Sequence, residues 1–451
     1  MFSRFAAALM CTLLCASVME AQTANRCTGK QEVACVLPTL FGGSPDITLP
    51  DNLKHIAHFE DSTQTVNLIP LTTAIATQLT LLPIPSPASG FTFSYDPSVN
   101  ASVRTAQSFG PVLTERGETI GRGKVFIGFG YQRFRFGEID GENLHKLPIV
   151  FQHDPTQAKA PADIITTMNN VDLKIDQFVA YGTVGLTNRL DVSIAIPIMD
   201  VRLGASSQAN IVRLAGANEL ACGPNNNYYC HFFDPKDKAN STSKSYSNRG
   251  SASGIGDVVV RVKYEVYGGP GKSLAMSFLT DVRTPTGDEK NYLGAGAVGV
   301  KPFLALTFGR GRIAPHLNVG YQWNGRSLLA GDILTGYKRH LPGQFFYSSG
   351  IDVGVTKRLT IALDYLVQQL YNAPRVINSP LSLYNPNIQS TQSFPRLVQG
   401  HNTDYGVNSG AIGFKYNPFG GLLITANVLL QADSGGLRQR AVPLIGLSYI
   451  F

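Results

Sequence analysis

Histidine is the residue type in this sequence best suited to act as a catalytic base or a metal ligand. The eight histidines are His55, His58, His145, His153, His231, His316, His340 and His401. A nucleophilic serine would need such a base within hydrogen-bond reach, yet no Gly-x-Ser-x-Gly motif accompanies any of them. His55 and His58 have a His-x-x-His spacing, and a lone pair of this kind does not define a metal site. The sequence therefore predicts no catalytic residue, no metal site and no cofactor.

Residues 1–21 have the features of a secretory signal peptide. Arg4 supplies the basic start, and an apolar stretch over 5–19 follows it. We expect cleavage after Ala21. A lipidated Cys15 is disfavoured because Leu14 stands where a small residue is expected. The mature chain is therefore expected to be exported.

Four cysteines remain after this cleavage, and they form two pairs with equal spacing. Cys27 and Cys35 enclose seven residues, as do Cys222 and Cys230, and both stretches are polar and loop-like. Neither has the short cysteine spacing or paired histidines of a zinc site. In an exported chain this pattern predicts two local disulfides.

From about Gly123 onward, apolar and polar residues alternate over 10 to 14 residues at a time. A period of two over such lengths predicts strands, and a tilted strand of about 9 to 11 residues spans a bilayer. Charged residues make up only 15% of the chain, against about 25% in soluble domains. No Lys/Arg-rich run marks a nucleic-acid site. The pattern favours strands that face lipid on one side.

The connections between these strands alternate between short and long. Short turns on one rim and long loops on the other are typical of outer-membrane barrels. We predict an all-β, antiparallel transmembrane barrel of about twelve strands over residues 122–451. The long connections are expected at 137–170, 207–255, 284–296, 325–343 and 372–403.

The last strand carries the pattern expected of a barrel-insertion signal. Ile445, Leu447, Tyr449 and the terminal Phe451 share one phase, and an aromatic residue at the final lipid-facing position suits the interfacial girdle. The even strand number places this end on the short-turn, periplasmic side. We expect the barrel-assembly machinery to recognise it, and outer-membrane lipid and lipopolysaccharide to surround the wall.

Residues 22–121 break the strand rhythm. Pro70 to Leu82 predicts a helix, and segments 91–95 and 101–108 are expected to form a hairpin. If that hairpin joined the wall, the barrel would have fourteen strands. We favour a plug or periplasmic segment instead, with Arg104, Glu115, Arg116 and Glu118 paired to wall charges.

The strand phase also predicts which side chains line the lumen. Charges of both signs can pair across the interior or bind the plug, and aromatic rings can hold an apolar solute. His316, beside Asn318 in sequence phase, is expected there as a polar lining residue. The predicted solute path comprises Phe126, Phe134, Phe136, Phe178, Arg261, Lys263, Asp281, Arg283, His316, Arg438 and Arg440.

Two stretches resemble the outer-membrane barrels assigned to the meta-pathway of phenol degradation. Ser253-Gly-Ile-Gly-Asp257 opens a strand, and Pro285-Thr-Gly-Asp288 closes the next one. The blocks 108–124 and 131–134 resemble the region between plug and first strand in the same family. The resemblance implies uptake of small hydrophobic or aromatic compounds, loosely as in long-chain fatty-acid channels.

Three functions remain open from the sequence. The first is a plugged outer-membrane channel for small hydrophobic or aromatic compounds. The second is a structural or adhesive barrel whose long loops form its exposed surface. The third is an outer-membrane hydrolase, which would need a Ser–His pair facing the lipid.

Overall fold

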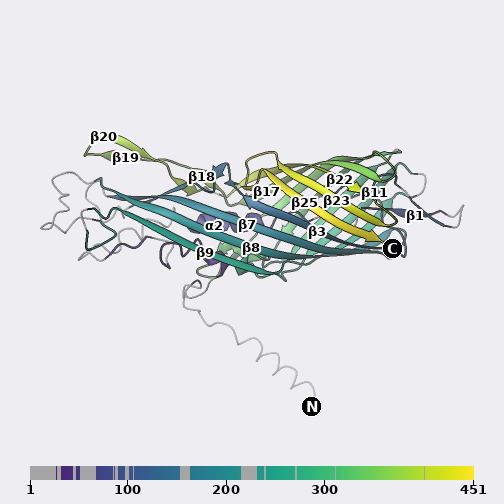
Figure 1. Cartoon of the computed structure of the whole chain (residues 1–451), viewed down its shortest axis with the longest axis horizontal. Coiled ribbons are helices and arrows are strands. Elements are labelled where there is room, and N and C mark those ends of the chain that lie inside the picture. The colour runs from purple at the N-terminus through teal and green to yellow at the C-terminus, as the bar shows by residue number, and fades with distance from the viewer. Residues whose placement is uncertain are drawn as a thin grey trace, which may run out of the picture.

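The chain is almost entirely β, as its alternating sequence predicts (Figure 1). Among the described residues no helix is long and apolar enough to cross a membrane. The computed structural model describes residues 27, 32–43, 47–50, 68–84, 86, 90–96, 101–104, 106–152, 163–214, 231–237, 240–269, 272–309, 311–400 and 402–451.

Twelve antiparallel strands form a closed ring. Neighbours in sequence pair around the wall, and the last strand, β25, pairs with the first, β3. The prediction of a twelve-stranded barrel is confirmed. The wall strands are β3 (Val125–Phe136), β7 (Ile164–Gly185), β8 (Leu190–Val212), β10 (Val259–Tyr267), β11 (Leu274–Arg283), β12 (Gly299–Phe308), β13 (Ile313–Asn324), β16 (Gly343–Gly354), β17 (Leu359–Ala373), β22 (Thr403–Tyr416), β23 (Leu422–Gln431) and β25 (Ala441–Ile450).

The barrel does not have fourteen wall strands, which was the alternative expectation. β1 (Phe93–Asp96) and β2 (Ala101–Arg104) pair only with each other. They lie at the end of the barrel that carries the C-terminus (Figure 1). Four-residue strands are too short to span a bilayer, so the hairpin stays outside the wall.

β7 and β8 extend the wall far beyond the length that a membrane requires. They are 22 and 23 residues long, and β6 (Leu147–Gln152) and β9 (Ser243–Ile255) pair with their outer ends. The expected loops at 137–170 and 207–255 were therefore too long, because strand structure fills part of each.

The remaining elements are short and lie between wall strands or before them. They are η1 (Val33–Cys35), α2 (Leu68–Leu79), β4 (Glu138–Ile139), β5 (Glu142–Asn143), η3 (Glu289–Asn291), β14 (Arg326–Asp332), β15 (Tyr337–His340), β18 (Val376–Asn378), β19 (Leu381–Asn385), β20 (Ser390–Phe394), β21 (Leu397–Gln399) and β24 (Leu437–Arg438).

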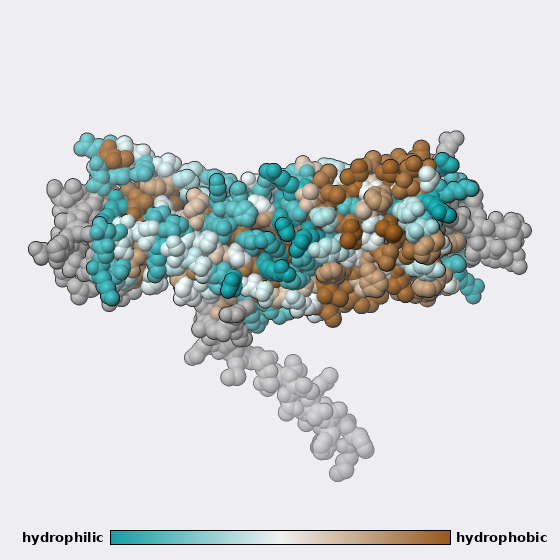
Figure 2. Space-filling view, viewed as in Figure 1, coloured by the Kyte–Doolittle hydropathy of each residue, from teal (hydrophilic) through white to brown (hydrophobic). Residues whose placement is uncertain are grey.

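An apolar outer band surrounds the half of the wall nearest the short turns, here called the membrane half. Large apolar side chains point outward there, with Phe129 60% and Trp323 57% exposed. Figure 2 shows this band at the end that carries the C-terminus. Since such exposure is stable only against lipid, the band marks the membrane-spanning zone.

The main hydrophobic core lies inside the other half of the barrel, here called the loop half. Inward residues of β7 and β8, such as Leu173 and Val201, pack with Ile75 of α2 and Leu37. α2 also packs on β14, β18, β21 and β24, which belong to the long connections. The N-terminal part of the chain thus fills the loop half from within.

Candidate functional site in the barrel lumen

Residues 108–120, here called the floor segment, cross the lumen of the membrane half. Their polar groups bond to inward side chains of eight wall strands. Glu115 donates its backbone N–H to Asn318 at 2.7 Å, and Ile120 donates its own to Asp191 at 2.9 Å. The wall partners are Asp191, Arg261, Lys263, Glu265, Ser277, Thr307, Asn318, Asp352, Thr360, Asp364 and Lys415.

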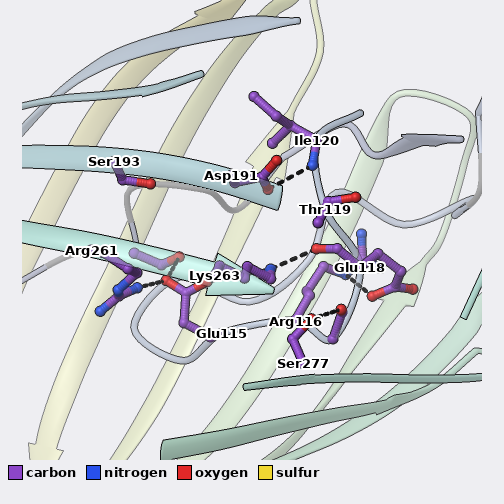
Figure 3. A network of polar contacts seen from close by, with 12 residues as sticks. Glu115, Arg116, Glu118, Thr119, Ile120, Asp191, Ser193, Arg261, Lys263 and Ser277 are labelled. Carbon is purple, nitrogen blue, oxygen red and sulfur yellow. Dashed lines mark hydrogen bonds and ion pairs between the residues drawn. The ribbon is translucent and has the colours of Figure 1, made fainter. Parts of the chain in front are cut away.

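Arg261 is the centre of the largest group of charges. Its guanidinium donates to both oxygens of Asp281, at 2.6 and 2.8 Å, and to Glu115 of the floor segment (Figure 3). Lys301 also lies 3.4 Å from Asp281. Lys263 donates to the backbone carbonyl of Glu118 at 2.5 Å. These contacts attach one side of the floor segment to β10, β11 and β12.

A second group of charges attaches the opposite side of the floor segment. Arg116 is buried and lies 3.3 Å from Asp352. His316 sits between two carboxylates, with Nε2 2.7 Å from Asp364 and Nδ1 3.3 Å from Asp352. Thr114 donates to Asp364 at 3.0 Å. Removing one member would leave another buried charge unpaired, which is strongly destabilising.

The expected plug pairings are found only in part. Glu115 and Arg116 pair with wall charges. Glu118 instead lies 3.9 Å from Arg116, within the floor segment itself. The side chain of Arg104 lies outside the described residues.

Residues 79–84, here called the divider segment, follow α2 and separate three cavities. The largest, the central cavity, has a volume of about 170 Å³. The others have volumes of about 90 and 60 Å³ and lie toward β25 and β8, respectively. Leu82 lines all three. The divider segment is therefore the part of the chain that keeps the cavities apart.

Aromatic, aliphatic and a few polar groups line the central cavity together. Phe303 and Phe346 meet edge to face at 5.7 Å, and the ammonium of Lys301 lies 5.0 Å from the Phe346 ring centre. Gln344 is 4% exposed, and its Oε1 has no hydrogen-bond partner among the described residues. A buried acceptor of this kind is costly unless a partner arrives. The lining suits a small apolar ring with one polar substituent.

The smallest cavity carries a second unpartnered group. The hydroxyl of Tyr292 is buried without a hydrogen-bond partner among the described residues, and burial raises its pKa. It lies in the connection between β11 and β12, on the loop side. A hydroxyl here can bond a polar group that reaches the cavity from the outside.

Most residues of the predicted path point inward, but they do not form one site. Arg261, Asp281 and Arg283 line the central cavity, whereas Phe134, Phe136 and Arg438 line the 90 Å³ cavity. Phe126 packs with Phe91 and Phe109 near the short turns. Lys263 and His316 hold the floor segment.

Two predicted path residues lie elsewhere. Phe178 is 52% exposed on the outer face of the wall, where its ring lies 4.7 Å from that of Tyr131, so the prediction that it lines the lumen is wrong. Arg440 is exposed beside the start of β25 and lines none of the three cavities. The sequence reasoning missed Leu82, Phe303, Phe346 and Lys415. The strand phase of Lys301 could have identified Phe303.

The two motif stretches that carry the family resemblance meet in space. Asp257 accepts backbone N–H groups from Gly287 at 3.0 Å and Ala295 at 2.7 Å. Thr286 donates to the carbonyl of Gly256 and accepts from the backbone N–H of Val258, both at 2.9 Å. These bonds tie the junction between β9 and β10 to the connection after β11. The motif residues are therefore structural here.

The first predicted disulfide is confirmed, since Cys27 and Cys35 are bonded. Cys222 and Cys230 lie outside the described residues, so their bond stays a prediction. No group of three or more His, Cys, Asp or Glu in the described part of the chain could hold a metal ion. Ile445, Leu447, Tyr449 and Phe451 all face outward and are exposed; their role in barrel insertion stays a prediction.

A closed antiparallel wall with an apolar outer band and a polar lumen defines a bacterial outer-membrane β-barrel. Within that class, residues 156–370 match the family model described as "Putative MetA-pathway of phenol degradation". The resemblance seen in the sequence is thus confirmed. No curated protein matches the chain by sequence.

Solved structures to which the chain is similar include three proteins of Pseudomonas. The COG4313 outer membrane channel of Pseudomonas putida F1 is 11% identical, with 75% of this chain and 99% of that one covered and a TM-score of 0.43. A FadL homologue of Pseudomonas aeruginosa is 10% identical, with coverage of 81% and 96% and a TM-score of 0.31. The toluene transporter TodX of P. putida is 9% identical, with coverage of 73% and 89% and a TM-score of 0.31.

Proposed function

We propose that this barrel is an outer-membrane channel for small hydrophobic or aromatic compounds. The central cavity carries the proposal, since its volume is about 170 Å³ and it combines two aromatic rings with Lys301 and Gln344. An apolar protein cavity of about 150 Å³ is large enough to bind benzene. The family description, which names phenol degradation, supports an aromatic solute.

Residues 22–121 serve in this proposal as the plug of the channel, and residues 122–451 as its wall. The floor segment is held by buried charges, whereas the divider segment contacts the cavities through Leu81, Leu82 and Pro83. A solute would pass from one cavity to the next when the divider segment moves. Arg283 donates to the carbonyl of Thr80 at 3.0 Å and would set how readily it does so.

Truncating Leu82 tests this function. Leu82→Ala should join the cavities and raise the accumulation of labelled toluene severalfold in cells that carry the protein in their outer membrane, because it removes the side chain that separates the cavities and leaves a void in its place. Leu304→Ala removes the same side-chain atoms from the outer face of β12, where Leu304 is 39% exposed. It should leave uptake unchanged.

Equal uptake by Leu82→Ala, Leu304→Ala and the parent protein would contradict the proposal. A cell without the barrel supplies the background. Phe346→Ala should lower uptake of toluene, because it removes a ring from the central cavity. An increase with Phe346→Ala would mean that the cavity only obstructs the path.

A structural or adhesive role remains the second candidate, and one feature favours it. The hairpin β19–β20 lies at the loop end of the wall (Figure 1), where Asn387 donates to the carbonyl of Arg213. It exposes Tyr384, and Ile388 is 59% exposed at its tip. Cell attachment that depends on this hairpin, together with unchanged solute uptake in all cavity variants, would support this role.

A further inference from the structure

A row of three cations runs across the outer face of the barrel. Strand register places Arg135 of β3 opposite Lys174 of β7, and Lys174 opposite Arg202 of β8. All three side chains point outward, on the same face of the sheet. Like charges directly opposite one another in a sheet are destabilising. This cation row therefore needs negative charge close to it.

Carboxylates of the chain neutralise the cation row only in part. Lys174 pairs with Asp172 at 2.6 Å, and Arg202 pairs with Asp200 at 2.5 Å. Arg135 has no carboxylate partner among the described residues, nor has Arg249 of β9, which lies opposite Gly204. The face thus carries a surplus of positive charge with free guanidinium donors.

A hollow lies directly beside the cation row. Its volume is about 610 Å³. It is lined by the cations Lys174, Arg202 and Arg249, by Gly204, and by Asp172, whose carboxylate pairs with Lys174. A Cβ built on Gly204 would meet nothing within 4 Å. The hollow is therefore open space on the outer surface, with cations around its edge.

The position of the row along the barrel axis fits the surface of a membrane. Two rows nearer to the short turns, the outward residues are Tyr131, Phe178, Ile198 and Ile255 in register. At about 3.3 Å per residue, the cations lie roughly 13 Å farther along the strands, which is about 10 Å along the barrel axis at a strand tilt of about 40°. Figure 2 shows hydrophilic residues gathered on this face next to the apolar band. Aromatic residues mark the interface of such barrels, so the row reaches the headgroup level on the loop side.

We propose that this face binds the phosphorylated headgroup of a glycolipid of the outer leaflet. Arginine binds phosphate through paired N–H groups, and such charge-assisted bonds are among the strongest in proteins. The phosphates would lie in the hollow between Lys174, Arg202 and Arg249, with Arg135 at the far end of the cation row, and the acyl chains would run along Phe178 and Ile198. This site is on the opposite side of the wall from the lumen and is independent of solute passage.

Lipid binding by the full mature protein in detergent tests the proposal. The probe is diphosphorylated lipid A, and bound lipid is measured by native mass spectrometry. The variant Arg135→Gln/Lys174→Gln/Arg202→Gln should bind it at least about tenfold more weakly, because it removes three cationic hydrogen-bond donors from the phosphates. The matched control Arg189→Gln/Lys357→Gln/Arg358→Gln removes the same charge from the short-turn rim, and its binding should equal that of the parent.

A second variant keeps every charge and fills the hollow. Gly204→Leu should also weaken lipid A binding about tenfold if the headgroup occupies that space. Unchanged binding by both Gly204→Leu and the triple variant would overturn the proposal. So would equal binding of dephosphorylated lipid A, of phosphatidylglycerol, or of inorganic pyrophosphate alone, because each would show that no phosphorylated glycolipid is recognised.

Discussion

The two halves of this barrel differ in which face of the wall is apolar. In the membrane half the wall is apolar outside and polar inside, where Arg261 and Asp281 meet the floor segment. In the loop half the wall is polar outside, and Leu173 and Val201 pack inward against the core around α2. The same strands, β7 and β8, pass through both halves without a change of register. In each half, the apolar face of the wall is the face that contacts apolar neighbours. These neighbours are lipid outside the membrane half and protein inside the loop half.

The N-terminal part of the chain follows this reversal. It presents apolar residues such as Leu68 and Ile75 to the loop half, and backbone and charged groups to the membrane half. The polar contacts fix the floor segment, whereas the cavities lie beside the apolar divider segment. We therefore expect the membrane half to hold its insert tightly and the divider segment to be the part that moves.

Removing residues 22–121 should have the largest effect on this arrangement. A wall of twelve strands encloses more space than eight strands, whose side chains fill the interior. The emptied barrel should conduct as a wide, water-filled pore, whereas the complete protein should conduct little. Single-channel conductance in planar bilayers measures the change, and a heat-modifiable band in gels checks that the wall is folded.

Unchanged conductance in the folded, truncated barrel would mean that the N-terminal part does not close the lumen. Protease treatment from the periplasmic side gives an independent check. Loss of the whole of 22–121 from the intact barrel would likewise contradict a segment held inside.

The sequence predicted the membrane half well because its strands alternate in one phase from end to end. Arg261, Lys263 and Asp281 could be placed inward from that phase alone. Phe178 could not, because on β7 the apolar phase changes from inward at Val171, Leu173 and Ile175 to outward at Phe178. The local sequence does not show whether an apolar side chain faces lipid or a protein core.

The position of the divider segment between the cavities also could not be predicted from the sequence. In the sequence, Leu82 is only the last residue of the stretch 70–82 that predicts a helix. Its contact with three cavities depends on residues of β13, β17 and β22 that are hundreds of positions away. The hydrogen-bond partners of the floor segment likewise could not be predicted, because they come from strands that only the closed barrel brings together.

Breaking the charge group around Asp352 should have the next largest effect. Asp352→Ala leaves the buried Arg116 with only the more distant carboxylate of Glu118, at 3.9 Å, and removes one of the two carboxylates beside His316. Loss of one partner of a buried pair costs about 3–5 kcal/mol, so the heat-modifiable band should be lost at a lower temperature. The exposed pair between Lys338 and Glu289 supplies the control, since Lys338→Ala should cost less than about 1 kcal/mol.

Equal stability of these two variants would show that the floor segment is not held by its buried charges. A rise in conductance with Asp352→Ala alone would sharpen the comparison between the two halves, because it would tie closure of the lumen to this ion pair.

The smallest expected effect concerns the junction where the two halves meet on β9 and β10. Asp257 accepts two backbone N–H groups there, and the Cβ of an alanine at Gly294 would lie 2.2 Å from its carboxylate. Asp257→Ala should therefore cost about 1–3 kcal/mol, the usual result of leaving buried donors without acceptors. Asp257→Asn keeps an acceptor oxygen and should cost less. Asp257 lines the 60 Å³ cavity and lies 3.6 Å from Arg283, but it does not line the central cavity. Since the lining of the central cavity is kept, we expect toluene uptake by both variants to match the parent protein at temperatures where the barrel is folded. A loss of uptake in Asp257→Asn without a loss of stability would place this junction on the solute path and would extend the moving part of the molecule from the divider segment to the wall.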